Sequence, residues 1–99
     1  MIVITGSVIA REGQIADALA LSLEHVRRSR LERGCISHAV FHDAENPNRL
    51  FFFEEWADQA AVTAHFAVPA SRAFVQALAD FTSSAPQLAM YDATPIHSR

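Results

Sequence analysis

Cysteine is scarce in this sequence, since Cys35 is the only one among 99 residues. A single cysteine cannot form an internal disulfide, and no Cys-x-x-Cys or Cys/His spacing of a structural zinc site occurs. A reducing, cytoplasmic setting fits this composition best. We expect Cys35 itself to be a small buried hydrophobic residue, because nothing near it in the sequence would lower the pKa of its thiol.

The sequence also has no excess of basic charge. Eight Lys+Arg residues against eleven Asp+Glu residues give a net charge of -3, so the chain as a whole is not drawn to nucleic acid or anionic lipid. Residues 1–10 lack a basic segment and are followed by Arg11 and Glu12, which makes them too short for a signal peptide or a membrane span. We expect a strand there, and neither a nucleic-acid nor a membrane partner.

What the sequence has in quantity is apolar surface. Hydrophobic residues make up 51% of the 99 positions, enough for one core and one domain but for no more. There are no internal repeats, linkers or low-complexity segments. We therefore expect residues 1–99 to form a single domain, with residues 94–99 as a tail that is flexible or contacts a partner.

The patterns along the chain predict four strands and three helices. β-branched residues open the chain, Gly34 follows a long stretch of helical apolar spacing, and Asp58 is a helix N-cap residue. With helices 59–66 and 69–81 counted as one helical segment, the order β-α-β-β-α-β predicts an α+β, ferredoxin-like fold. Its antiparallel sheet carries the helices on one face. The expected strands are residues 2–10, 35–43, 49–56 and 86–93, and the expected helices are residues 14–32, 59–66 and 69–81.

Both faces of the predicted strand 49–56 are apolar. Side chains alternate along a strand, so Leu50, Phe52, Glu54 and Trp56 share one face, and Phe51, Phe53 and Glu55 share the other. One layer of helices covers one face, and an exposed patch of phenylalanine is unusual for a soluble monomer. Burial at roughly 25 cal/mol per Å² of apolar area favours covering the second face. We expect a homodimer that stacks sheet on sheet.

Residues 33–74 resemble the core signature of the antibiotic biosynthesis monooxygenase domain, a family of small dimeric α/β barrels. The chain departs from the family pattern at three positions. His38 stands where the family usually has Tyr, and Ala70 and Ser71 follow the proline where a second His or Tyr is frequent. The matching parts are Gly34-Cys35, Asp43 with Asn46-Pro47, Glu54-x-Trp56-x-Asp58, and Ala64-His65.

This resemblance implies a pocket between the sheet and its helices. Some members of the family oxygenate quinols, anthrones or similar aromatics with O₂ and without metal or flavin. The resemblance therefore implies a cofactor-independent monooxygenase acting on a small electron-rich aromatic. Two alternatives remain open: a non-catalytic barrel that binds a small molecule, and a haem-degrading or isomerase relative of the same fold.

Such an oxygenation needs a base, donors for the resulting anion, and a dry pocket. His65 is the first candidate for the base, because histidine exchanges protons near neutral pH. Glu54 shares a face with Phe52 and Trp56, so we expect a raised pKa unless a donor or cation partners it. Trp56 offers a flat wall and an N–H donor for a substrate oxygen. We name His65, Glu54 and Trp56 as candidate catalytic residues.

The substrate wall must come from side chains on several elements. Each assignment also has a purely structural alternative. His65 could serve only as a hydrogen-bond partner for the buried Glu54 carboxylate, and the aromatic residues could be ordinary members of the hydrophobic core. The candidate substrate-binding residues are Phe52, His38, Val62, Phe66, Phe74 and Met90.

The remaining histidines do not suggest a metal site. His38 and His42 share a strand face but lie roughly 13 Å apart at ~3.3 Å per residue, too far to chelate one ion. His25 and His97 are predicted to be surface residues. This spacing predicts no metal site, and the family resemblance implies that no other cofactor is needed.

Overall fold

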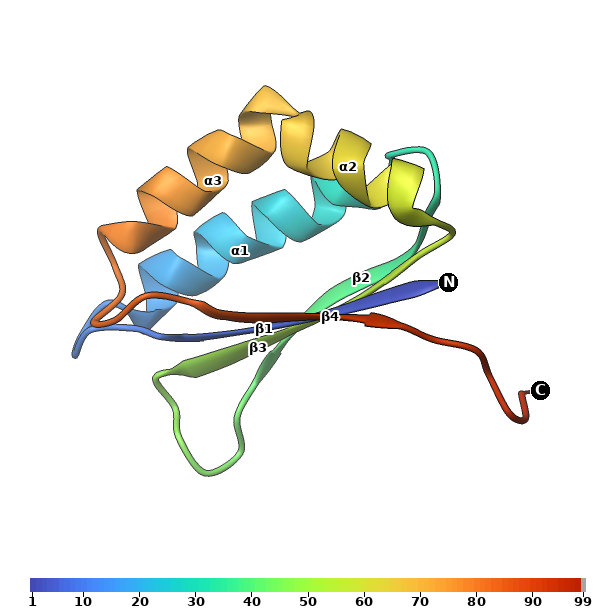
Figure 1. The fold of residues 1–99 in the computed structure, drawn as a ribbon. Helices are drawn as coiled ribbons and strands as arrows, with labels where there is room; N and C mark the ends of the chain where they lie inside the picture. The colour runs from blue at the N-terminus through green and yellow to red at the C-terminus, as the bar shows by residue number, and fades with distance from the viewer. Residues whose placement is uncertain (99) are drawn as a thin grey trace.

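The computed structural model describes residues 1–98, which form three helices on one face of a four-stranded antiparallel sheet (Figure 1). The strand order is β2-β3-β1-β4, so the predicted α+β, ferredoxin-like fold is confirmed. Within residues 1–98 no helix has the length and apolar character needed to cross a membrane. The elements are β1 (Ile2–Ile9), α1 (Ile15–Ser29), β2 (Cys35–His42), β3 (Arg49–Trp56), α2 (Gln59–Ala67), α3 (Pro69–Ala79) and β4 (Gln87–Asp92).

Residues close in the sequence determine where α2 and α3 begin. The side chain of Asp58 accepts a hydrogen bond of 2.9 Å from the backbone N–H of Ala61, which satisfies one of the unpaired donors at the helix start. Pro69 occupies the first turn of α3, where a missing N–H costs nothing. Both helices therefore begin where the sequence predicts.

The first helix is shorter than predicted. It ends at Ser29 instead of residue 32, because the N–H groups of Leu31 and Glu32 turn back to carbonyls three residues earlier and tighten the chain. Gly34, with φ of +85°, then redirects the chain into β2. Leu31, which lies within the predicted helix 14–32, is consequently outside α1 and 87% exposed.

Gly34 also sets how closely α2 approaches the start of β2. A Cβ atom added to Gly34 would lie 2.5 Å from the Cβ atom of Ala61, so no larger residue fits without movement. The backbone N–H of Ala57 donates to the Gly34 carbonyl at 2.8 Å. This contact fixes the position of α2, and with it that of His65.

The two faces of β3 are divided as predicted. Leu50, Phe52, Glu54 and Trp56 are buried beneath the helices. Phe52 belongs to one apolar cluster with Val8 and Leu78, and Trp56 belongs to another with Ile4 and Val62. Glu54 lies between Phe52 and Trp56 on this face, so a buried carboxylate separates two apolar clusters.

No helix within residues 1–98 covers the opposite face of the sheet (Figure 1). Phe51 and Phe53 lie on this face and are half-buried, while Phe41 from β2 and Tyr91 from β4 are 53% and 49% exposed. Their register partners place all four side chains on one side of the sheet. A broad apolar surface results, which we call the open face.

The C-terminal segment leaves the sheet after β4 (Figure 1). The backbone N–H of Ala93 donates to the carbonyl of Met1 at 2.8 Å, and residues 94–98 beyond it are exposed. The tail predicted for residues 94–99 extends to Arg99, which lies outside the described residues.

Candidate active site

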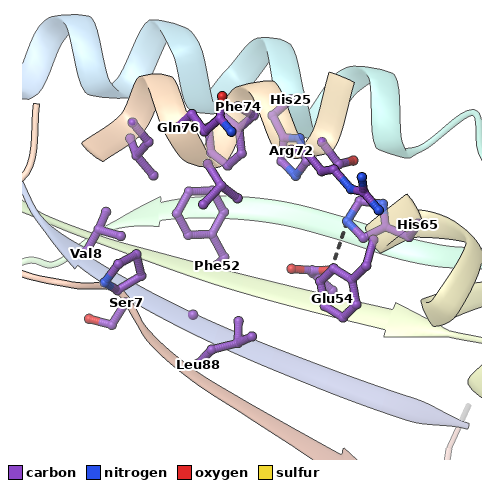
Figure 2. A pocket seen from close by; sticks show the side chains of 16 residues that line it. Ser7, Val8, His25, Phe52, Glu54, His65, Arg72, Phe74, Gln76 and Leu88 are labelled. Carbon is purple, nitrogen blue, oxygen red and sulfur yellow. Dashed lines mark ion pairs between the residues drawn. The ribbon is translucent and has the colours of Figure 1, made fainter. Parts of the chain in front are cut away.

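A pocket of about 570 Å³ lies between the helices and the sheet. Apolar side chains make most of its wall. Figure 2 shows His25, Glu54, His65 and Arg72 gathered near one end, with Val8 toward the other. The candidate residues Phe52, Glu54, His65, Phe66 and Phe74 all line this pocket.

Four candidate residues do not line the pocket. Trp56 and Val62 are 0% exposed and fill the apolar cluster beneath α2. His38 is 1% exposed and lies beside Glu54. Met90 is 52% exposed on the edge strand β4. The expected substrate contacts of His38, Val62 and Met90 are therefore not part of the pocket wall. Trp56 contacts two residues that line the pocket, Glu54 through its Nε1–H and His65 through ring centroids 4.5 Å apart.

Glu54 is 7% exposed and is held by neighbours on two strands and a helix. Its Oε1 accepts a hydrogen bond of 2.9 Å from Nε1 of Trp56. Nε2 of His38 lies 3.2 Å from the same oxygen without forming a hydrogen bond, so this contact is electrostatic. Burial acts to raise the pKa of Glu54, yet the contacts with His38, Trp56 and His65 outweigh it and lower the pKa. The carboxylate is ionised at neutral pH.

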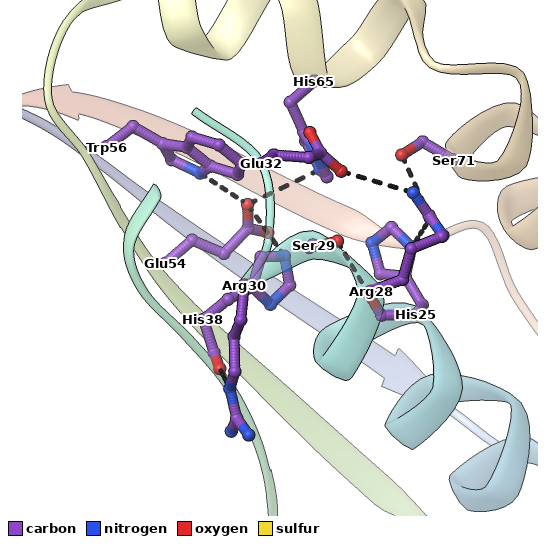
Figure 3. A network of polar contacts seen from close by, with 10 residues as sticks. All are labelled: His25, Arg28, Ser29, Arg30, Glu32, His38, Glu54, Trp56, His65 and Ser71. Atoms are coloured by element: carbon purple, nitrogen blue, oxygen red, sulfur yellow. Dashed lines mark hydrogen bonds and ion pairs between the residues drawn. The ribbon is translucent and has the colours of Figure 1, made fainter. Parts of the chain in front are cut away.

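His65 projects from α2 between two carboxylates and is 3% exposed (Figure 3). Its Nδ1 lies 2.9 Å from Oε1 of Glu32, so the ring donates its Nδ1–H to this acceptor. Its Nε2 then faces Glu54 at 4.0 Å. The sequence did not reveal Glu32 as a neighbour of His65, because the two lie 33 positions apart in the chain.

The prediction that His25 is a surface residue was wrong. His25 is 7% exposed and stacks on Phe74 with ring centroids 4.0 Å apart. Nη2 of Arg28 donates to its Nδ1 at 2.8 Å. Burial, followed by the nearby His38, His65 and Arg28, lowers the pKa of His25 to about 3, so the ring is neutral.

Three histidines from three elements therefore meet at one end of the pocket. The ring centroid of His25 lies 5.3 Å from that of His38 and 5.5 Å from that of His65. Their spacing in the sequence carries no signal, because α1, β2 and α2 meet only in the fold. The one local clue was the stripe formed by Ser22, His25 and Ser29 at helical spacing on α1, since small buried serines mark the face that packs on the sheet.

The family model described as antibiotic biosynthesis monooxygenase matches residues 1–77. The chain belongs to this family. The crystal structure of one antibiotic biosynthesis monooxygenase is 26% identical, covers 96% of this chain and 100% of that chain, and superposes with a TM-score of 0.88. The predicted family resemblance is thus confirmed.

Two further comparisons extend this result. A candidate antibiotic biosynthesis monooxygenase from Deinococcus radiodurans shares the fold with a TM-score of 0.93 at 22% identity, over 100% of this chain and 98% of that one. An uncharacterised protein of Synechocystis sp. PCC 6803 is 31% identical over 90 residues, which are 91% of this chain. The match spans 61% of that relative's length.

Proposed function

We propose that this family member is a monooxygenase that oxidises a small electron-rich aromatic, such as a quinol or an anthrone, with O₂ and without metal or flavin. The observation that carries the proposal is the position of His65. Its ring faces an apolar pocket of about 570 Å³ on one side and the ionised Glu54 on the other. This position supports a role for His65 as a base at the polar end of a mainly apolar pocket.

The pocket wall suits a flat, apolar substrate. Phe52, Phe66 and Phe74 supply aromatic surface, and His65 supplies the polar end. A ring bound against the phenylalanines would direct its hydroxyl or acidic C–H toward Nε2 of His65. Removal of water from this region strengthens the interaction between the base and the substrate.

The reaction begins with proton transfer to Nε2 of His65. The substrate anion passes one electron to O₂, and the resulting substrate radical and superoxide combine to form a C–O bond. The peroxide takes up the proton held by His65, and loss of water leaves a carbonyl. For an anthrone, a CH₂ group and O₂ thus become a C=O group and one H₂O.

Two carboxylates orient the ring of His65. Glu32 accepts from Nδ1 at 2.9 Å, and Glu54 lies 4.0 Å from Nε2. The contact with Glu32 keeps the ring hydrogen on Nδ1, which leaves the lone pair of Nε2 to accept a proton. Trp56 acts one step away, because its N–H is used by Glu54 at 2.9 Å. From the sequence we expected the N–H of Trp56 to donate to a substrate oxygen. In this proposal Trp56 instead positions Glu54.

The proposal includes a homodimer formed through the open face. Phe41 and Tyr91 are about half exposed there, and none of the three helices described lies on this side of the sheet. Apolar burial at about 25 cal/mol per Å² favours covering such a surface with a second copy. The proposal also places the protein in the cytoplasm, on the ground that Cys35 is the only cysteine.

Oxygen uptake with a panel of quinols and anthrones, in buffer containing a chelator, tests the function. We expect turnover by the wild-type protein and a loss of about 10²- to 10⁴-fold in His65→Ala. His97→Ala, an exposed histidine in the C-terminal tail, is the matched control. Turnover unchanged in His65→Ala would remove the base from the mechanism.

The same preparation distinguishes the alternatives. Substrate binding without oxygen uptake would indicate a non-catalytic barrel. A Soret band on haem titration, lost in His65→Ala, would favour a haem-degrading relative. Product of unchanged mass would favour an isomerase.

A further inference from the structure

We propose that His25, His38 and His65 form a binding site for one divalent transition-metal ion at the polar end of the pocket. This inference goes beyond the proposed function, which uses no metal. Because the lone pair of His65 cannot bind an ion and accept a proton at once, the two proposals describe two different states of the same site.

The first argument is the convergence of the three rings. One ring nitrogen from each histidine lies within 4.8 Å of the others. Nitrogens that share one ion at a bond length of about 2.0–2.1 Å are about 3 Å apart, so a contraction of about 1–2 Å completes the geometry. Small side-chain rotations on three separate elements can supply it. Imidazole is a preferred ligand of Zn²⁺, Cu²⁺, Fe²⁺ and Ni²⁺.

The second argument is the state of His38. Its side chain is 0% exposed, and neither ring nitrogen makes a hydrogen bond to another described residue. Most buried polar side chains find a partner, because an unpaired group loses its hydration without compensation. Metal ligation would satisfy one nitrogen of this ring.

The surrounding carboxylates complete the site. Glu32 accepts from Nδ1 of His65 at 2.9 Å, the arrangement by which a neighbouring carboxylate orients a ligating histidine. Oε1 of Glu54 lies 3.2 Å from Nε2 of His38 and 4.0 Å from Nε2 of His65. Glu54 therefore supplies negative charge and a further oxygen ligand. His25, His65 and Glu54 also line the pocket, so the ion would face a position open to water or substrate.

One neighbour opposes the ion. Nη2 of Arg28 donates to Nδ1 of His25 at 2.8 Å, which leaves the ring hydrogen on Nε2 (Figure 3). Ligation through Nε2 moves this hydrogen to Nδ1 and ends the contact, while Arg28 keeps Glu32 and Ser71, each at 3.3 Å. The guanidinium charge also repels a cation. Removing Arg28 should therefore tighten metal binding, the opposite of what removing a ligand does.

Titration of the untagged, EDTA-treated full chain with CoCl₂ tests the proposal. We expect visible d–d absorption that saturates at one Co²⁺ per chain and is displaced by Zn²⁺. His38→Gln and His65→Gln should each weaken Co²⁺ binding by at least about tenfold. Loss of a residue that merely orients a ligand already weakens metal binding by about that factor, and loss of a ligand should weaken it no less. Circular dichroism and thermal unfolding establish that each variant is folded. His42→Gln and His97→Gln, both exposed, are the matched controls and should bind as the wild type does.

The Arg28→Met variant provides an independent test. Tighter Co²⁺ binding supports the assignment of His25, and an unchanged or weaker affinity would remove His25 and with it the three-histidine site. Absence of the cobalt spectrum in the wild-type protein, or equal binding in His38→Gln, would overturn the proposal. The titration needs no substrate and the oxygen-uptake assay runs with a chelator, so either proposal can fail without the other.

Discussion

Oε1 of Glu54 accepts a hydrogen bond of 2.9 Å from Nε1 of Trp56, two residues further along β3. The period of two along a strand puts both side chains on the helix-covered face. This bond is one reason why the buried carboxylate remains ionised, although burial alone would raise its pKa. A raised pKa was expected for Glu54 unless a hydrogen-bond donor or a cation partnered it. Trp56, on the same strand, is such a donor.

Trp56→Phe keeps an aromatic ring but removes the donor to Glu54. We expect a loss of about 1–3 kcal/mol in the free energy of unfolding at pH 7, because a buried acceptor loses its partner. Urea denaturation measures it. In the Glu54→Gln background the same substitution should cost less, since the acceptor is no longer charged. Equal costs in the two backgrounds would show that the loss comes from packing alone.

Gly34→Ala should destabilise the fold more than Gly13→Ala. Both glycines have a left-handed backbone, with φ of +85° and +80°, so each substitution carries the backbone penalty of about 1–2 kcal/mol. Only at Gly34 does the new Cβ atom meet a neighbour, at 2.5 Å from Ala61, while nothing lies within 4 Å at Gly13. Chemical denaturation of the two variants gives the difference.

Ala61→Gly provides the check on this explanation. In the double variant with Gly34→Ala the clashing Cβ atom is absent, so the cost of Gly34→Ala should fall toward that of Gly13→Ala. A cost that is additive in the double-mutant cycle would contradict a direct contact between residues 34 and 61.

The protein should lose stability as the pH falls below about 6.5, in part through His25. Burial lowers the pKa of this ring from 6.5 to about 3, so between these values the unfolded chain binds a proton that the folded chain does not. Stability therefore rises with pH across this window, by at most about 1.4 kcal/mol per pH unit from one group. Water that reaches the ring reduces the effect.

Denaturation at several pH values in EDTA, for the wild type and His25→Gln, isolates the contribution of His25. The variant lacks the titrating ring, so its stability should fall less steeply between pH 6 and about 4. Parallel pH profiles for the two proteins would contradict the lowered pKa.

Phe53→Glu should convert the proposed dimer to a monomer. Phe53 lies on the open face at the centre of β3, and a charge there would be buried without a partner in a sheet-on-sheet dimer. Light scattering should give twice the chain mass of 10.9 kDa for the wild type and 10.9 kDa for the variant. Leu31→Glu adds the same charge at a position that is 87% exposed beside α1, and should leave the dimer intact. A wild-type mass of 10.9 kDa would end the dimer proposal.

Cys35 should react slowly with iodoacetamide at pH 8. Its side chain is half-buried, less than expected, and burial followed by the charges of Glu32 and Glu54 raises the pKa of the thiol. Because the thiolate is the reactive form, the rate should keep rising with pH above 9. Mass spectrometry of timed samples measures it, with the urea-unfolded chain as reference. Equal rates in the folded and unfolded chain would contradict the raised pKa.

The sequence by itself determined the features that depend on neighbours along the chain. Alternation along Arg49–Trp56 assigned both faces of β3, the side chain of Asp58 fixed the start of α2, and the signature around Glu54-x-Trp56 identified the family. These patterns are local because strand period and helix capping act over a few residues. Such local patterns failed at Leu31. The apolar spacing typical of a helix continues through this residue, but α1 ends at Ser29 and the chain turns toward Gly34.

Only the tertiary structure decided which polar groups meet. Glu32 reaches His65 across 33 positions, and His25 joins the cluster because α1 packs its serine-bearing face over the sheet beside α2. Such meetings depend on how closely two elements approach, here set in part by the space that Gly34 leaves for Ala61. The periodicity of a sequence indicates which face of a helix or strand a residue occupies. The distance between two such faces depends on how side chains from distant segments pack together.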